Sequence, residues 1–226
     1  MKESCIDMYT FLDKKHLKTL ASDLASRIEA YSRLGGRVCF YKDDIEGGIV
    51  FGDVRVDIGF TDGNFKPCRE NSFDITRDDF ETTIGNLFAY SVSLHQKSPR
   101  YQRLRQKYLP FYDDDLRKAR LAGTAEEFDY KIWKTRWLAE RGEYFAALDA
   151  LLEAQRIFLQ HLFIQQRKYP IDYVKWLKEQ CSEILAMPNL YKELTSIVNG
   201  IELTKSAVVN KSNLLEKLFK KYRSHT

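Results

Sequence analysis

The chain has 226 residues, a formal net charge of +4, 44% apolar residues and 13% aromatic residues. This composition excludes a disordered chain, and the length suits one large domain or two modest ones, of which we favour two. The charge excess is small and spread evenly, so it gives no strong indication of nucleic-acid binding.

The four cysteines form no Cys-x-x-Cys pair and follow no signal-peptide pattern. We therefore expect reduced thiols rather than a zinc site or a disulfide framework. The longest apolar runs, such as residues 146–152, are much shorter than the roughly twenty residues that a membrane span needs. These features predict a cytoplasmic protein with no membrane partner.

The first predicted element is a strand over residues 4–9. Side chains alternate along a strand, so Ile6 and Met8 share one face while Asp7 and Tyr9 share the other. An amphipathic helix follows over residues 14–34 and ends at a Gly-Gly pair. Strands are then predicted over residues 38–41, 49–51 and 54–60, the last two joined by a Gly-Asp turn.

The strand over residues 54–60 repeats the pattern of the first one. Asp57 stands opposite a face formed by Val56, Ile58 and Phe60. If the two strands lie side by side, Asp7 and Asp57 point at one place.

The remainder of the chain is predicted to be helical. One helix starts near Thr76 and ends before Ser98-Pro99, and further helices are expected over residues 100–108, 114–122, 126–141, 144–167, 171–185, 190–199 and 214–223. In the helix over residues 144–167, the apolar spacing makes Phe145, Leu152 and Leu159 part of the core face. The predicted class is α+β, with a mixed-sheet domain over residues 1–97 and a helical bundle domain over residues 98–226.

Two groups of residues carry a resemblance to a known family. The run Ser4-Cys5-Ile6-Asp7 is similar to the Ser-Asp-Ile-Asp strand of the nucleotidyltransferase superfamily typified by the aminoglycoside (kanamycin-type) nucleotidyltransferases, with Asp57 at the place of the family's third carboxylate. In the second half of the chain, Arg141-Gly142-Glu143 and Lys175-Trp176 resemble the helical domain that follows the catalytic domain in several members. The family's Gly-Ser turn has no counterpart here, so the resemblance implies a truncated nucleotidyltransferase-like palm.

The resemblance also implies a reaction and its residues. A nucleoside monophosphate passes from a nucleoside triphosphate to a hydroxyl group of a small molecule, with Mg²⁺ held by Asp7 and Asp57 and with Asp57 nearest the acceptor as the catalytic residue. Ser4 and Lys175 would bind the triphosphate. Cys5 replaces the family's first carboxylate, and a soft thiol ligand should weaken magnesium binding.

Other interpretations remain open from the sequence. The chain could be a catalytically degenerate module that binds a nucleotide or a protein, or a helical interaction protein, and an exposed sheet edge could support a homodimer. Asp57 could form a surface ion pair with Arg55, and Lys175 could lie on an amphipathic helix with Trp176 in the core. We interpret His161 as a core or boundary histidine, the basic residues 100–107 as helix surface, and Gly47-Gly48 as a turn.

Overall fold

The computed structural model describes residues 6–21, 26, 29–30, 32–42 and 46–223. Their secondary structure confirms a mixed α+β protein. The chain forms two compact units, one from the residues up to Phe65 together with Ser93–Leu104, the other from Lys66–Val92 together with Arg105 onward. The units interleave along the chain, so this division does not coincide with the single boundary that we expected after residue 97.

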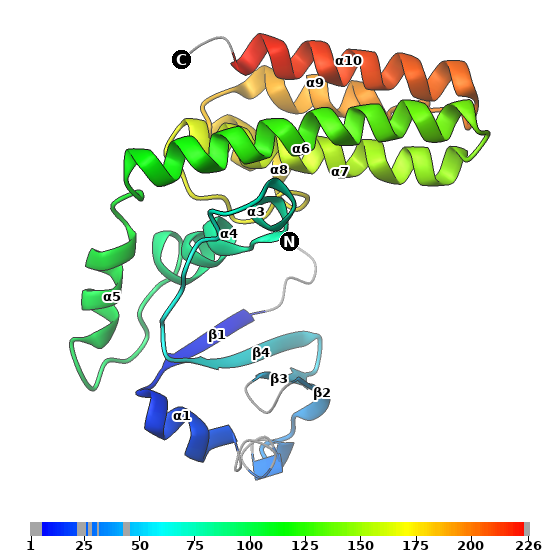
Figure 1. The fold of residues 1–226 in the computed structure, drawn as a ribbon. Coiled ribbons are helices and arrows are strands. Elements are labelled where there is room, and N and C mark those ends of the chain that lie inside the picture. Colours follow the sequence, from blue (N-terminus) through cyan, green and yellow to red (C-terminus); the bar gives the residue numbers. More distant parts are fainter. Residues whose placement is uncertain (1–5, 22–25, 27–28, 31, 43–45, 224–226) are drawn as a thin grey trace. The chain divides into compact units, whose positions relative to one another are not determined.

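The first unit contains a mixed sheet of four strands in the order β1-β4-β3-β2 (Figure 1). Strands β1 and β4 pair in parallel, whereas β4 with β3 and β3 with β2 pair antiparallel. The elements of this unit are β1 (Ile6–Phe11), α1 (Lys14–Ala21), β2 (Arg37–Lys42), β3 (Glu46–Phe51) and β4 (Val54–Thr61). The described residues between Ala21 and Arg33 are also helical, as the sequence predicts.

The β3–β4 hairpin forms at the predicted turn. Phe51 pairs with Val54, and Gly52 between them has a φ of +57°, which glycine adopts without steric cost. The strand before the turn is longer than expected, because Gly47 and Gly48 lie inside β3 and pair with β4. The interpretation of these two glycines as a turn is therefore wrong.

One face of the sheet carries the apolar residues. Ile49 is buried and packs with Phe51, Ile58 and Phe60. Gly36 lies against this cluster so closely that a Cβ atom there would come within 2.5 Å of the Ile49 side chain. The acidic residues therefore occupy the opposite face, because side chains alternate along each strand.

The first turn of α5 (Arg100–Tyr108) is attached to the ends of β1 and β4. The Arg100 guanidinium forms an ion pair with Asp13 and donates a hydrogen bond of 2.7 Å to the carbonyl oxygen of Asp62. The ring of Tyr101 lies 5.8 Å from that of Phe11. Arg100 thus has a structural role, while Arg103 and the other basic residues of α5 lie on its exposed surface, as predicted.

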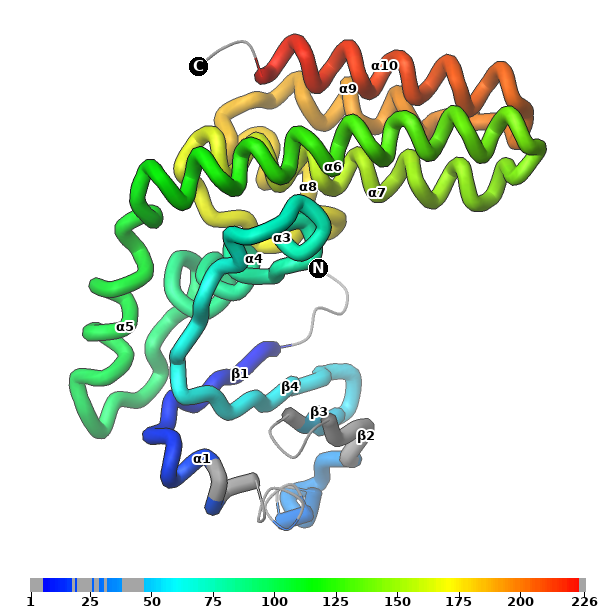
Figure 2. Tube along the Cα trace, viewed as in Figure 1, coloured from blue at the N-terminus to red at the C-terminus, as the bar shows by residue number. Residues whose placement is uncertain are grey.

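The second unit is mainly a helical bundle in which α6 and α7 run side by side (Figures 1 and 2). Its helices are α3 (Ser72–Arg77), α4 (Phe80–Ile84), α6 (Asp114–Glu140), α7 (Tyr144–Gln165), α8 (Leu177–Glu179), α9 (Pro188–Val198) and α10 (Lys205–Arg223), with π-helical turns over Gly85–Ala89 and Gln180–Ile184. The core lies where α6, α7, α9 and α10 meet, around Phe128, Phe158 and Phe219.

Helix α6 is continuous through the place where two helices were predicted. The expected break lay at Gly123, but this glycine is buried inside the helix. A Cβ atom at position 123 would come within 2.7 Å of the Ile75 side chain and 3.4 Å of the Ser72 Cα atom. Gly123 therefore allows α3 to approach α6 and does not end the helix.

Helix α7 buries a different face from the one predicted. Phe145 and Leu152 are exposed, so their assignment to the core is wrong, whereas Leu159 is buried as expected. The buried face carries small residues, Ala147, Ala150 and Ala154, together with larger apolar ones further along. The small side chains allow neighbouring helices to come close, and that contact sets the rotation of α7.

The prediction of a helix over residues 171–185 is wrong in its first part. Asp172 accepts hydrogen bonds from the backbone N–H groups of Val174 and Lys175, and the side chain of Gln180 donates to the carbonyl oxygens of Asp172 and Lys175. Trp176 then has a φ of +56°. These side-chain bonds hold a non-helical turn, and α8 begins only at Leu177.

Candidate functional site

The candidate site lies on the polar face of the sheet, across β1 and β4. Asp7 and Asp57 are register partners in this parallel strand pair. Neighbouring strands lie about 4.8 Å apart, and residues directly opposite each other project to the same face. The structure therefore brings the two predicted carboxylates side by side.

The other neighbours of Asp57 on this face are two glycines. On the β3 side its register partner is Gly48, which has no side chain. Two residues further along β4 is Gly59, again without a side chain. Both glycines are nevertheless buried, Gly59 under the ring of Tyr9, so the acidic area is confined to the two carboxylates themselves.

Arg55 occupies one edge of this area. Its Nε atom donates a hydrogen bond of 2.7 Å to Oδ1 of Asp57, as the surface ion-pair interpretation predicted. The Arg55 side chain is 46% exposed and that of Asp57 is 22% exposed. Exposed ion pairs of this kind contribute only about 0–1 kcal/mol, so a dication or a phosphate group could displace the pairing at low cost.

Tyr9 lies on the same face, two residues after Asp7. A Cβ atom on Gly59 would come within 2.7 Å of the Tyr9 ring, so the ring covers this glycine. The tyrosine is about half exposed. The alternation along the strand places Tyr9 on the same face as Asp7, but the residue pattern alone assigns no role to its ring.

The area can be compared with what a magnesium ion requires. Mg²⁺ prefers hard oxygen ligands, usually one or two carboxylates completed by water and phosphate oxygens. Asp7 and Asp57 provide that donor set. Among the residues that the structure describes, no group of three or more acidic, histidine or cysteine side chains could hold a metal ion by itself.

The other predicted site residues are placed differently. Ser4, and Cys5 beside it, lie outside the described residues. Lys175 belongs to the second unit, where it is exposed in the turn before α8. Trp176 is 47% exposed, so the interpretation that places it in the core is wrong.

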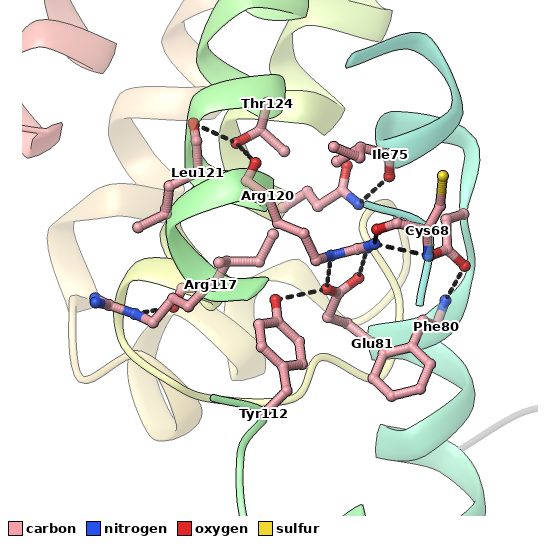
Figure 3. Close-up of polar contacts among 12 residues, drawn as sticks. Cys68, Ile75, Phe80, Glu81, Tyr112, Arg117, Arg120, Leu121 and Thr124 are labelled. Atoms are coloured by element: carbon pink, nitrogen blue, oxygen red, sulfur yellow. Dashed lines mark hydrogen bonds and ion pairs between the residues drawn. The ribbon is translucent and has the colours of Figure 1, made fainter. Parts of the chain in front are cut away.

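The second unit contains a buried polar network centred on Arg120 (Figure 3). The guanidinium donates to both carboxylate oxygens of Glu81 and to Oδ2 of Asp78, each at 2.7 Å, and to the carbonyl oxygen of Cys68 at 2.6 Å. Tyr112 donates to Glu81 at 2.9 Å. The network joins the segment around α3 and α4 to α6, and we interpret it as structural because its charged groups are paired with each other.

His161 is buried in the same unit, as predicted. Its Nδ1 atom lies 2.9 Å from the hydroxyl oxygen of Thr124, and its ring packs against Phe219. Burial, together with the positive charges of Arg223 and Arg117, lowers the pKa of His161 to about 4. The imidazole is therefore neutral at pH 7 and belongs to the core.

Comparisons with known proteins add no family: no family model and no curated protein matches the chain. Within the described part of the chain, each helix is too short or too polar to cross a membrane. The geometry of the sheet face is therefore the feature that points to a functional site.

Proposed function

We propose that the chain is a magnesium-dependent nucleotidyltransferase-like protein whose site is the polar face of β1 and β4. The observation that carries the proposal is the register pairing of Asp7 with Asp57. Two carboxylates side by side repel each other, and a dication between them offsets this repulsion more strongly than an exposed ion pair such as that of Arg55 with Asp57 does.

The same face also carries groups that could bind the phosphates and the base of a nucleotide. Arg55 is placed to pair with a phosphate oxygen once it leaves Asp57, because a guanidinium binds phosphate and carboxylate in the same way. The half-exposed ring of Tyr9 offers a surface on which a base can stack. Carboxylates, a guanidinium and an aromatic ring together favour a metal-bound nucleotide over a bare ion.

The two carboxylates share one role in the proposed transfer, and Asp57 has a second role. Asp7 and Asp57 hold the metal, and Asp57 also accepts the proton of the acceptor hydroxyl group. The hydroxyl oxygen forms a bond to the α-phosphorus while the bond from that phosphorus to the pyrophosphate oxygen breaks, and pyrophosphate leaves. When bound, Mg²⁺ supplies the positive charge that offsets the negative charge on the phosphate oxygens.

A second candidate is a module that binds a nucleotide or a protein without chemistry. It is favoured by the ion pair between Arg55 and Asp57, because the guanidinium neutralises this carboxylate without a metal ion. It is also favoured by the small donor set, since two carboxylates are fewer than many two-metal enzymes use.

Calorimetric titration with ATP, with and without Mg²⁺, tests the two candidates. We expect binding that requires Mg²⁺ and falls at least tenfold in Asp57→Asn. Asp53→Asn, which alters an exposed carboxylate in the turn of the same hairpin, serves as the matched control and should bind normally. Binding that is equal without Mg²⁺ supports the binding module, and no binding to the wild type in either condition contradicts the proposed nucleotide site.

A further inference from the structure

A row of exposed aromatic residues follows the outer face of α6. Tyr130, Trp133 and Trp137 are 47%, 54% and 43% exposed. Their rings stack in sequence, with centroids 5.8 Å apart for each neighbouring pair and interplanar angles of 27° and 14°. The Arg141 guanidinium lies 4.6 Å from the ring centre of Trp137 and extends the row.

Large aromatic side chains are enriched in protein interfaces, where they dominate the binding energy. Here the row has a regular spacing of three and four residues, which keeps it on one side of the helix. The opposite side of α6 carries the core residues Phe128 and Ile132. The row is therefore a second, outward-facing apolar stripe on a helix whose inner side is already packed.

The charges around the row show which partner suits it. Glu126 lies on the same helix face one turn before Tyr130, and Arg141 lies at the other end. Lys134 lies beside the middle of the row, next to Trp133. The row thus has an acidic end, an aromatic centre with a lysine, and a basic end.

We propose that this row is the contact surface for a second copy of the chain, with the two α6 helices antiparallel across a two-fold axis. In that arrangement Arg141 of each copy meets Glu126 of the other, Trp137 meets Tyr130, and Lys134 meets Trp133. Every group faces a complementary one, as a two-fold interface requires. An in-register parallel arrangement would place like charges together.

The charges also disfavour a nucleic acid as the partner. Two acidic side chains, Glu126 and Asp129, lie on or beside the row, against two basic ones, Lys134 and Arg141, while the nearby Glu140 is already paired with Lys205. Proteins that stack bases on aromatic rings surround them with positive charge, because the phosphates must be neutralised. The charges along the row balance, and this lack of positive excess favours a protein partner.

The size of the row indicates how strong this dimer is. An aromatic side chain can bury about 150–250 Å², so three rings at half exposure present roughly 300 Å². A standard interface needs about 800 Å² on each partner. We therefore expect a reversible dimer with a dissociation constant in the micromolar range, centred on the row and completed by its neighbours.

Sedimentation equilibrium, over protein concentrations from about 1 to about 200 µM, tests the proposal because dimerisation depends on concentration. Trp133→Glu should raise the dissociation constant at least tenfold. Leu214→Glu changes a similarly exposed apolar residue on α10 and should leave it unchanged. Circular dichroism melting confirms that each variant is folded.

A charge exchange distinguishes the antiparallel pairing from other contacts. Glu126→Arg and Arg141→Glu should each weaken the dimer, because each places like charges opposite one another. The double exchange restores opposite charges and should return the dissociation constant to within about threefold of the wild-type value. A monomeric wild-type protein over the whole range, a dimer insensitive to Trp133→Glu, or a double variant weaker than either single one would overturn the proposal. So would binding of oligo(dT) by a monomer that Trp133→Glu abolishes.

Discussion

Arg120 on α6 and Glu81 on α4 form a bidentate ion pair in which neither side chain has exposed surface. Both of the oxygens of Glu81 accept hydrogen bonds of 2.7 Å from the guanidinium. Burial and the neighbouring Glu81 carboxylate also raise the pKa of Tyr112 far above its ordinary value, so its hydroxyl group remains a donor to Glu81. The stability of the second unit should depend on keeping this pair intact.

Arg120→Met should lower the free energy of unfolding by about 3–5 kcal/mol, because it leaves the Glu81 carboxylate buried without its partner. Urea denaturation measures this change. Arg136→Met is the matched control: Arg136 pairs with Glu216 but is about one-third exposed, so the expected loss is below about 1 kcal/mol.

The double variant Glu81→Met with Arg120→Met separates loss of the pair from loss of one partner. It should be more stable than Arg120→Met alone, because the fully buried Glu81 carboxylate is gone and only the partly exposed Asp78 loses its partner. Should Arg120→Met unfold the protein, Tyr112→Phe is a milder probe, with an expected loss of about 1 kcal/mol. Equal stability of Arg120→Met and Arg136→Met would contradict the structural role.

The lowered pKa of His161 predicts a pH dependence of folding. The imidazole has a pKa of about 4 in the folded chain and about 6.5 in an unfolded chain. Between these values the unfolded state binds the proton more readily, so stability is constant above about pH 6.5 and falls as the pH approaches 4. From pH 7 to pH 5 this group should lower the free energy of unfolding by about 2 kcal/mol.

His161→Gln removes this contribution. The difference in unfolding free energy between pH 7 and pH 5 should become about 2 kcal/mol smaller than in the wild type, because carboxylates still titrate but the histidine does not. Urea denaturation at both pH values provides the measurement. His95→Gln, at an exposed position, should leave the pH dependence unchanged; an unchanged slope in His161→Gln would show that the imidazole is protonated without unfolding.

Gly123 and Ile75 offer a test of close helix packing. Gly123→Ala gains about 0.5–1 kcal/mol in helix propensity, but its Cβ atom meets the Ile75 side chain at 2.7 Å, and overpacking costs about 1–3 kcal/mol. The net expectation in thermal or urea unfolding is a loss of about 1 kcal/mol. In an Ile75→Val background the interfering Cδ1 atom is absent, and the same Gly123→Ala change should stabilise the protein. A loss of equal size in both backgrounds would show that the contact with Ile75 is not the cause.

Much of the first unit could be predicted from local pattern. The alternation around Asp7 and around Asp57, with the Gly52-Asp53 turn, predicted two strands with their acidic residues on one face. The structure pairs these strands and places the two residues opposite each other. This prediction was possible because side chains alternate with a period of two along a strand, so the position of a strand determines the face of each of its side chains.

The errors arose where specific side-chain contacts, and not the apolar periodicity, decide the local structure. From the sequence alone, Gly123 is expected to break the helix. The contact with Ile75 shows instead that the glycine allows α3 to pack closely against α6. Likewise, Asp172 and Gln180 hold a turn in a segment whose composition suits a helix. Such hydrogen bonds depend on the side chains meeting in space, which periodicity does not report.

The role of Tyr9 in nucleotide binding can be tested separately from the metal. Tyr9→Ala should weaken binding of Mg²⁺·ATP about tenfold through loss of base stacking, for which about 1–3 kcal/mol per base is typical. Its effect on Mn²⁺ binding without nucleotide should be small. Tyr101→Ala, which removes an aromatic ring elsewhere in the same unit, is the control. Equal affinity of wild type and Tyr9→Ala for Mg²⁺·ATP would remove Tyr9 from the proposed site.

The central claim is that Asp7 and Asp57 hold one divalent cation, and Mn²⁺ binding measured by water-proton relaxation tests it most directly. We expect Asp7→Asn and Asp57→Asn each to weaken Mn²⁺ binding at least tenfold, and the double variant to be little weaker than either single one, because ligands of a shared ion are strongly coupled. Unchanged Mn²⁺ affinity in both single variants, or losses that simply add in the double variant, would contradict a shared metal site.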